Sequence, residues 1–472
     1  MIKSQYFLFL VLLLPLAAFG QGRGIDAVVG SGDSSGAEKI LVRFINIEGN
    51  RKTRASIIYR ELSISPDTYV ANNKLAEVTE LNRKRVFNLS LFTEAVIRVD
   101  TVDTYTVDWT IIVKEQWYII PEFTFKLADR NFNVWWEEQN HDIRRANIGV
   151  TLKDRNFRGN LEQLSITAQI GYTQRFGIDY FRPYVDKQQK HGFGFSFFLA
   201  QNEEKYYTTD SNKWLFARTP GTYVIKEFEV AGNYVYRPRY ASRHLFELRY
   251  RNHRVGDTIL LLNPEYYENN SRVLKLIELG YRYDLNKVDN WNYPLEGFKT
   301  VVNSDVRIGI EGMTFQAYLA VEAGYFKKIR RKWFYSSIVR GRLTFPEDQP
   351  YTYRSAMGID EEYVRGYEYY VIDGSQYGLI RNNFKYELLN TAIRKIPIRY
   401  ISVLPVRLYP KIFTDVGYGR NKFPGNSSLN NQMLYSAGFG LDVVSAYDFK
   451  LRLEYTFNHL GEKGLFLHLS SE

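Results

Sequence analysis

The sequence predicts a mainly β protein, in which a transmembrane antiparallel β-barrel of about 16 strands follows one small α/β domain. From Trp117 onward, segments of about ten residues alternate between apolar and polar side chains and are separated by turns, as membrane barrel strands do. Aromatic residues make up 16% of the chain, including 37 Tyr, and such barrels carry aromatic girdles at both rims. An apolar segment at the N-terminus predicts export from the cytoplasm.

Residues 1–20 are expected to form a signal peptide. Lys3 provides the positive charge, residues 6–16 form an apolar core that is too short to span a bilayer as a helix, and small residues stand at Ala18 and Gly20. No later stretch is apolar enough to be a transmembrane helix, so any membrane span is expected to be a barrel.

Residues 21–38 are rich in Gly and Ser and predict a flexible linker. Within it, residues 32–36 fit the Gly-x-Ser-x-Gly pattern of serine hydrolases, in which Ser34 would be the nucleophile. Such a serine is exposed by a strand before it and a helix after it, and a linker supplies neither. We therefore predict that the chain is not an enzyme.

Residues 39–116 predict a small α/β domain with the order strand, helix, helix, strand, strand. Thr53 and Asn73 stand where they could cap the two helices. The strands are expected at residues 40–47, 94–99 and 106–113.

Residues 117–472 predict the barrel, and the alternation is clearest between Phe449 and Asn458. One face of this segment carries only apolar or aromatic side chains, at Phe449, Leu451, Leu453, Tyr455 and Phe457. The other face is polar throughout, with Lys450, Arg452, Glu454, Thr456 and Asn458. This pattern indicates lipid outside and polar packing inside. Strands are expected near residues 118–127, 143–153, 160–171, 174–183, 190–201, 222–236, 241–256, 272–285, 296–309, 313–327, 332–346, 377–389, 407–420, 432–445, 447–458 and 463–470.

The composition narrows the possible partners. The chain has no Cys, which excludes disulfides and thiolate metal sites, and its six His lack the spacing of metal ligands, so no metal and no cofactor are expected. The net charge is +10, but Lys and Arg are spread along the chain with no clustered tract evident. This distribution argues against binding to nucleic acid. It favours contact of the basic side chains with anionic lipid headgroups, or no specific binding partner for them.

A polar, turn-rich stretch from residue 346 to residue 376 separates two predicted strands and contains Val364, Arg365, Gly366 and Tyr367. It is long for a hairpin loop, and long ordered loops are usually functional. Gly366 permits backbone conformations that other residues rarely adopt. Two interpretations are open, an exposed basic turn or a loop that folds back and places the Arg365 guanidinium against a partner.

The N-terminal domain resembles a polypeptide-transport-associated (POTRA) domain, in a single copy. The resemblance rests on residues 47–50 (Ile-Glu-Gly-Asn), the Thr53 that follows, residues 88–92 (Asn-Leu-Ser-Leu-Phe) and residues 113–115 (Val-Lys-Glu).

The barrel resembles the outer-membrane assembly superfamily typified by BamA and TamA, the bacterial surface antigen family. Residues 364–367 are similar to its Val-Arg-Gly-Tyr/Phe loop, and residues 413–417 to its Phe-x-Asp-x-Gly strand motif. Residues 289–298 and 156–160 resemble a motif that precedes a strand and an early turn of these barrels. The resemblance spans residues 40–472, but the chain has one POTRA domain where relatives often have several, and its last strand lacks the usual terminal aromatic residue.

The resemblance implies that the loop after the eleventh strand folds into the barrel and that Arg365 meets Asp415 on the inner wall. The residues agree with this, because Asp415 shares its strand face with Phe413 and Gly417, and Gly417 leaves room for an incoming loop. An Arg–carboxylate pair in a narrow lumen gains from bidentate geometry and weak screening.

Three functions stay open at this point. The first is an assembly factor of the bacterial outer membrane, whose periplasmic POTRA domain receives unfolded outer-membrane protein clients and whose barrel opens at a seam between residues 118–127 and residues 463–470. The second is an accessory or structural barrel within an outer-membrane complex. The third is a polypeptide secretion channel. Outer-membrane lipids, and possible further subunits of an assembly complex, are the other expected partners.

Overall fold

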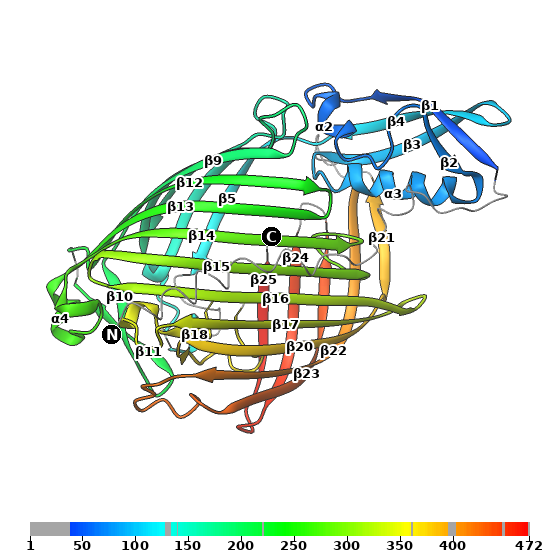
Figure 1. Ribbon diagram of the computed structural model, residues 1–472. Helices are drawn as coiled ribbons and strands as arrows, with labels where there is room; N and C mark the ends of the chain where they lie inside the picture. The colour runs from blue at the N-terminus through cyan, green and yellow to red at the C-terminus, as the bar shows by residue number, and fades with distance from the viewer. Residues whose placement is uncertain are drawn as a thin grey trace, which may run out of the picture. The chain divides into compact units, whose positions relative to one another are not determined.

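The computed structural model describes residues 38–127, 134–138, 140–219, 221–359, 362–394, 403–445 and 449–470. The expected signal peptide, the Ser34 motif and nearly all of the expected linker lie outside these residues. The chain divides into two compact units, one up to Glu115 and one from Gln116. Figure 1 labels the elements of both units.

The first unit is a four-stranded sheet with the order β2-β1-β4-β3, on which two helices pack. β1 runs parallel to β4, and the other pairs are antiparallel. Its elements are β1 (Lys39–Glu48), α2 (Ala55–Tyr59), β2 (Thr68–Ala71), η3 (Asn72–Lys74), α3 (Leu75–Phe87), β3 (Phe92–Asp103) and β4 (Thr106–Glu115). Trp109, Ile111, Ile57 and Ile58 form the centre of its core.

Two details of this unit differ from the prediction. The four-residue strand β2 was not expected, because a strand this short shows too little alternation. The expected caps at Thr53 and Asn73 are wrong, since the N-cap positions belong to Arg54 and Lys74 and neither makes a side-chain capping bond. The backbone N–H of Thr53 instead donates to Glu115 at the end of β4.

The second unit is a closed barrel. Within the described residues, the closed order contains 17 strands, of which β20 and β21 both pair with β22 and so occupy one position. The wall therefore has 16 strand positions, at the places where the alternation predicted them. Their bounds are β5 (Ile119–Leu127), β6 (Ala146–Asp154), β7 (Gln163–Gly171), β8 (Thr173–Arg182), β9 (His191–Asn202), β12 (Ile225–Arg239), β13 (Ser242–Val255), β14 (Val273–Val288), β15 (Gly297–Glu311), β16 (Phe315–Arg330), β17 (Trp333–Phe345), β20 (Gln376–Tyr386), β21 (Leu389–Arg394), β22 (Val403–Arg420), β23 (Met433–Val444), β24 (Lys450–Asn458) and β25 (Lys463–Ser470).

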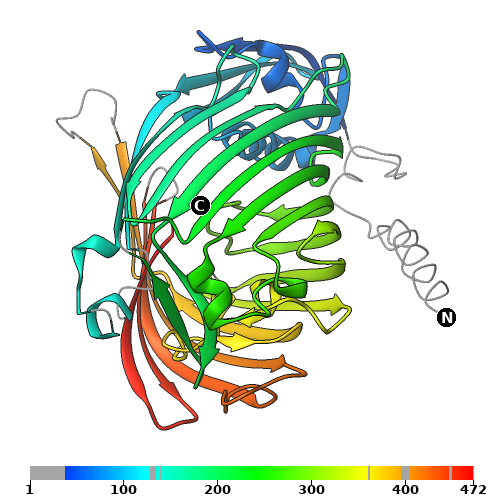
Figure 2. The same cartoon turned by 90° about the vertical axis from the view of Figure 1, so that its left-hand side faces the viewer.

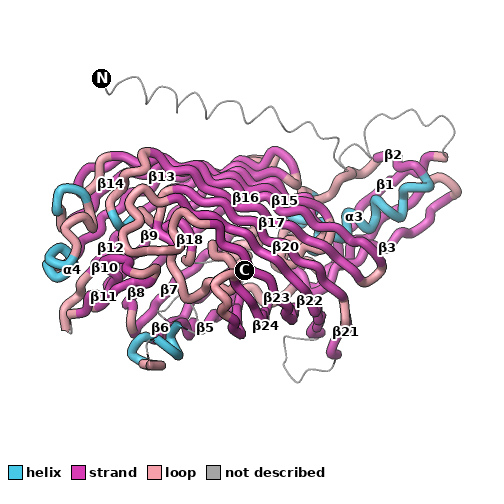
Figure 3. The backbone as a smooth tube through the Cα atoms, turned by 90° about the horizontal axis from the view of Figure 1, so that it is seen from below, coloured by secondary structure: helices cyan, strands magenta, loops and turns pink. Residues whose placement is uncertain are grey.

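Side chains on these strands alternate between a buried polar inner face and an exposed apolar outer face. On β24, Glu454 and Thr456 are buried while Phe457 is exposed, as the sequence predicts. On β22, Asp415 is buried and Ile412 is exposed. Figure 3 shows a wall built from strands. None of the helices in the described residues has the length and apolar character needed to cross a membrane.

The two rims of the barrel are distinct. We call the rim where β5 begins the proximal rim and the opposite one the distal rim. The distal rim, which faces the viewer in Figure 2, carries a hairpin and short helices that the sequence did not predict. These are η4 (Val134–Glu138), η5 (Ile143–Arg145), β10 (Glu204–Asp210), β11 (Lys213–Arg218), α4 (Asp257–Leu262) and η6 (Glu268–Asn270). Ile259, Tyr266, Tyr267 and Tyr351 pack there in one apolar cluster.

One place in the wall departs from a regular ladder. β20 pairs with both β17 and β22, and its pairing with β17 ends at Trp333 and Tyr386. β21, which follows, pairs with β22. The expected strand at 377–389 therefore ends earlier, and its continuation keeps β22 as a neighbour beyond the last residue pair with β17. β25 and β5 are neighbours in the closed order, and together they close the wall.

Candidate functional site

The loop between β17 and β20 covers residues 346–375 and is described except at 360–361. It contains the helical turn η7 (Tyr351–Tyr353) and the short antiparallel pair β18 (Ser355–Met357) and β19 (Ile372–Asp373). Val364, Tyr367 and Ile372 of the loop pack in one buried cluster with Leu379 on the inner face of β20. The loop is therefore ordered against the inner wall, and it is not an exposed turn.

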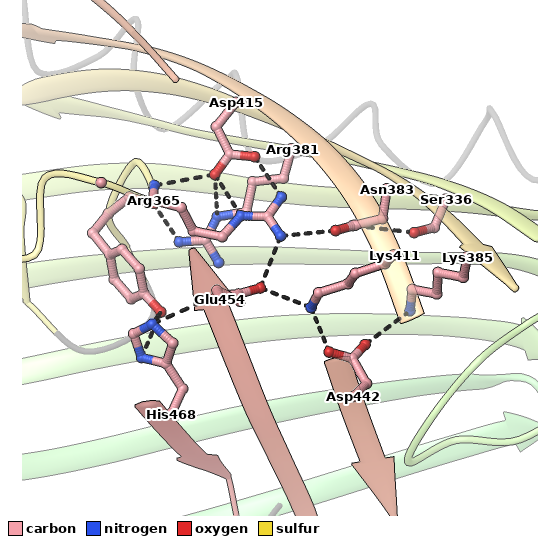
Figure 4. Close-up of polar contacts among 12 residues, drawn as sticks. Ser336, Arg365, Arg381, Asn383, Lys385, Lys411, Asp415, Asp442, Glu454 and His468 are labelled. Atoms are coloured by element: carbon pink, nitrogen blue, oxygen red, sulfur yellow. Dashed lines mark hydrogen bonds and ion pairs between the residues drawn. The ribbon is translucent and has the colours of Figure 1, made fainter. Parts of the chain in front are cut away.

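Arg365 meets the inner wall through each part of its guanidinium (Figure 4). Nε and Nη2 donate to Asp415 Oδ2 and Oδ1 at 2.8 and 2.5 Å, and the backbone N–H of Arg365 donates to Oδ2 at 3.1 Å. Nη1 donates to Asn383 Oδ1 at 2.8 Å and to Glu454 Oε1 at 3.0 Å. The guanidinium carbon lies 3.9 Å from the centroid of the Phe413 ring.

The three charged side chains of this site are buried, which strengthens the ion pairs between them. The side chain of Arg365 is 4% exposed, and those of Asp415 and Glu454 are 0% exposed. A charge-assisted, bidentate ion pair in a buried site is strong. If one partner is removed, water cannot reach the remaining charge to solvate it, so that charge destabilises the fold.

Two glycines allow the loop to approach this closely. A Cβ on Gly417 would lie 2.4 Å from Val364 Cγ2, so any side chain there would collide with the loop. Gly366 has a φ of +89°, a left-handed conformation that favours glycine. The carbonyl of Gly366 accepts a hydrogen bond from Asn458 Nδ2 at 2.8 Å. Val364, Gly366 and Gly417 together set the docked position of Arg365.

The polar contacts continue along the wall away from the loop. Glu454 is 2.7 Å from Lys411 Nζ, and Lys411 also pairs with Asp442. Asp442 lies 3.8 Å from Lys385 Nζ and accepts a hydrogen bond from the Tyr293 hydroxyl at 2.7 Å. The network thus joins β20, β22, β23 and β24 to the loop before β15.

The loop also contacts the inner face of the last strand, β25. The Tyr363 hydroxyl lies 3.1 Å from His468 Nδ1, and Glu368 lies 3.5 Å from His468 Nε2. The Tyr369 ring stacks edge-on against Phe466 with centroids 5.6 Å apart. Tyr367 holds the neighbouring hairpin, because its hydroxyl donates to the Tyr435 carbonyl at 3.2 Å. The last strand, which closes the barrel against β5, is therefore held by the loop.

The contacts that hold the loop on the wall are non-covalent. They are made by ion pairs, amides and tyrosine hydroxyls. Among the described residues, no group of three or more His, Asp or Glu has the arrangement of a metal site.

The structure brings together Arg365, Phe413 and Asp415, and it sets Val364 on Gly417. Sequence reasoning placed Glu454 on the inner face but missed it as a second partner of Arg365. It also missed Asn383, Lys411, Asp442 and His468. The polar alternation marks each of them as inward, but only the register between strands shows which inward groups meet.

Two known families match the chain. The Omp85 superfamily domain matches residues 156–464. The surface antigen variable number repeat, a POTRA domain, matches residues 40–116. None of the curated proteins matches the chain in sequence.

Several solved structures resemble the chain at low sequence identity. BamA from Haemophilus ducreyi lacking POTRA domains 1–3 is 14% identical with a TM-score of 0.49, covering 91% of this chain and 83% of that one. CdiB from Acinetobacter baumannii is 12% identical with a TM-score of 0.49, covering 91% of this chain and 73% of that one. CdiB from Escherichia coli is 11% identical with a TM-score of 0.49, covering 95% and 92%.

Proposed function

Because this chain belongs to the Omp85 superfamily, we propose that it inserts or assembles β-barrel proteins in the bacterial outer membrane. The POTRA domain lies in the periplasm in this proposal, so the proximal rim faces the periplasm and the distal rim faces outward. Clients are unfolded outer-membrane proteins, and the barrel wall opens between β5 and β25 to admit a client strand.

One observation supports this proposal above the others: the loop contacts β25 from inside the barrel. Tyr363, Glu368 and Tyr369 contact the inner face of β25, while Arg365 of the same loop is fixed to β22 and β24. A strand held from inside the barrel can leave its neighbour on the other side without unfolding. The docked loop supports β25 in this way, at the place where β25 and β5 close the barrel.

The exposed strand edges supply the means of recognition. Once β5 and β25 part, their backbone N–H and C=O groups are free to pair with a client strand. In the POTRA domain, β3 is an edge strand of 12 residues with Val96 and Val102 exposed. An edge of this length can add an extended client segment by backbone hydrogen bonding.

The test is a covalent lock on the seam. The chain has no native Cys, so pairs of cysteines can be placed on the lipid-facing sides of the two strands, at Phe123 or Phe125 on β5 and at Leu465 or Leu467 on β25. Oxidation is expected to abolish client insertion in reconstituted vesicles, and reduction to restore it. Full client insertion with the seam closed would refute insertion through the seam, and no client insertion by the unlocked chain would favour an accessory barrel.

A secretion channel is the second candidate, because the strands enclose a lumen in which the loop is held by non-covalent contacts. A chain could pass through the barrel only if the loop left its site on the inner wall. Cysteines at Ile372 of the loop and Gly419 of β22, whose Cβ atoms would lie 3.6 Å apart, would lock the loop in place. A loop lock that blocks export of a secreted polypeptide, together with a harmless seam lock, would support the channel over the assembly factor.

A further inference from the structure

The hairpin between β16 and β17 carries a dense run of positive charge at the proximal rim. Five of the six residues at 327–332 are Lys or Arg, in the sequence Lys-Lys-Ile-Arg-Arg-Lys. The expectation that the chain holds no basic tract is therefore wrong at this place. All six residues are exposed, and the hairpin reaches beyond its neighbours at this rim (Figure 1).

The outer side of this hairpin continues the lipid-facing band of the barrel. Tyr325 and Ile329 of β16 and Trp333 of β17 are 51%, 49% and 40% exposed. The Trp333 ring stacks on Phe384 with centroids 5.0 Å apart and lies 4.7 Å from Tyr386. An aromatic group of this kind is typical of the boundary between hydrocarbon and headgroups. The basic residues thus begin where the aromatic belt ends.

Few acidic groups neutralise the run. Lys328 Nζ lies 3.7 Å from Glu296, and both side chains are about half exposed, so water weakens the pair. Another basic turn at the same rim differs in this respect, because Arg158 at residues 155–162 is 2.6 Å from the buried Glu162. The positive field of the β16–β17 hairpin is therefore directed outward from the barrel.

We propose that this hairpin is a docking surface for anionic phospholipid headgroups in the leaflet at the proximal rim. Trp333, Tyr325 and Ile329 enter the headgroup boundary, and Lys327, Arg330 and Arg331 contact the phosphates beside it. A bilayer fits these observations better than an acidic protein does. Apolar side chains alternate with the cations along one hairpin, and the surface is continuous with the lipid-facing band.

The test uses the full chain, whose lack of Cys permits a single label. Ile329→Cys, labelled with an environment-sensitive fluorophore, is reconstituted in nanodiscs of phosphatidylcholine with rising fractions of phosphatidylglycerol. We expect a blue shift of the emission as phosphatidylglycerol rises, and reversal by salt. Lys327→Gln with Arg331→Gln should lower the equilibrium constant for this contact by about 25-fold, since each of the two cations near an anionic surface contributes a factor of about five.

Controls separate this proposal from general charge effects. Lys187→Gln with Lys190→Gln removes two cations from the β8–β9 turn at the same rim and should leave the shift unchanged. Retained heat-modifiable gel migration shows that each variant is folded. No response to phosphatidylglycerol, or equal losses in both double variants, would overturn the proposal. A shift caused by inorganic phosphate or by soluble polyglutamate, but not by phosphatidylglycerol, would also overturn it, in favour of free anions or an acidic protein.

Discussion

Two of the charge clusters on the inner wall are built differently. In the first, which we call the Asp415 cluster, Arg365 comes from the loop and joins Asp415 and Glu454 on the wall. In the second, the Glu278 cluster, all the charged groups come from the wall. Glu278 lies directly opposite Arg249 and Arg307 in the ladders of β13, β14 and β15, with Arg307 Nε at 2.6 Å.

Because the two clusters are built from different parts of the chain, one stabilises the wall and the other also fixes the docked position of the loop. Charges on adjacent strands meet whenever the ladder forms, so the Glu278 cluster depends on the register of the wall. The Asp415 cluster also needs the loop, because its strongest pair spans loop and wall. The loop touches the Glu278 cluster mainly through Tyr353, whose ring centroid is 4.6 Å from the Arg307 guanidinium carbon. Changes in the two clusters should therefore produce different defects.

The largest effect is expected from breaking the loop pair. Arg365→Ala and Asp415→Ala should each lower the free energy of unfolding by about 3–5 kcal/mol, because each leaves an uncompensated buried charge. The double variant should lose less than the sum, since neither charge is then stranded. Denaturant titrations in detergent, read by heat-modifiable migration in gels, measure this. Arg365→Lys should rescue only in part, because an ammonium lacks the planar fork. Strictly additive losses would contradict the paired arrangement.

A steric change should expel the loop without altering a charge. Gly417→Ala places a Cβ 2.4 Å from Val364 Cγ2 and should cost about 1–3 kcal/mol as overpacking. Protease cleavage within residues 346–375 should become faster, while the barrel stays folded. Gly378→Ala is the matched control on neighbouring β20, where an added Cβ meets nothing within 4 Å. If both variants were cleaved at the same rate, close packing at Gly417 would not hold the loop.

Disrupting the Glu278 cluster should weaken the wall and spare the loop motif. Glu278→Gln removes the carboxylate that faces three guanidinium groups and should lower the free energy of unfolding by about 1.5–3 kcal/mol. The yield of the Ile372–Gly419 cysteine crosslink should not change. A large fall in that yield would show that the two clusters are coupled.

The smallest effect is expected for an exposed pair of the same chemistry. In the POTRA domain, Arg43 donates to Asp108 at 3.1 and 2.7 Å, in a bidentate contact that water can reach. The hydrogen bond from Arg43 lowers the pKa of Asp108 below its ordinary value. The pair therefore stabilises the folded domain at neutral pH, and its contribution is lost as pH falls through the lowered pKa. Arg43→Ala should change protease resistance of this unit little at pH 7, and a loss as large as that of Arg365→Ala would contradict the role of burial.

The sequence was a good guide to the wall and a partial guide to the site. Alternation located the 16 strand positions because lipid outside and polar packing inside impose a period of two. It missed β2, β10 and β11, which are short or lie outside the wall, and the end of the β17–β20 pairing at Tyr386. At the site, motif residues 365 and 415 were found. The contacts of Arg365 with Asn383 and Glu454 were not, because they depend on how four strands align.

The Glu278 cluster is a second arrangement that the sequence pattern does not predict. Glu278, Arg249 and Arg307 each read as polar residues on an inward face, and nothing in the linear pattern sets them opposite one another. That arrangement follows from the ladders of β13, β14 and β15. A charge cluster built from separate strands becomes visible only when the hydrogen-bond pairing is known.

One long strand links two parts of the barrel. β22 runs without interruption for 18 residues, pairs with β21 at its start, and carries Asp415 further along. From Leu408 to Asp415 the distance along an extended strand is about 23 Å. The partner of the Arg365 guanidinium and the strand that pairs with β21 are therefore the same continuous backbone. A one-residue slip of β22 against its neighbours would turn Asp415 away from the lumen, so the docking site exists only in the correct register of this strand.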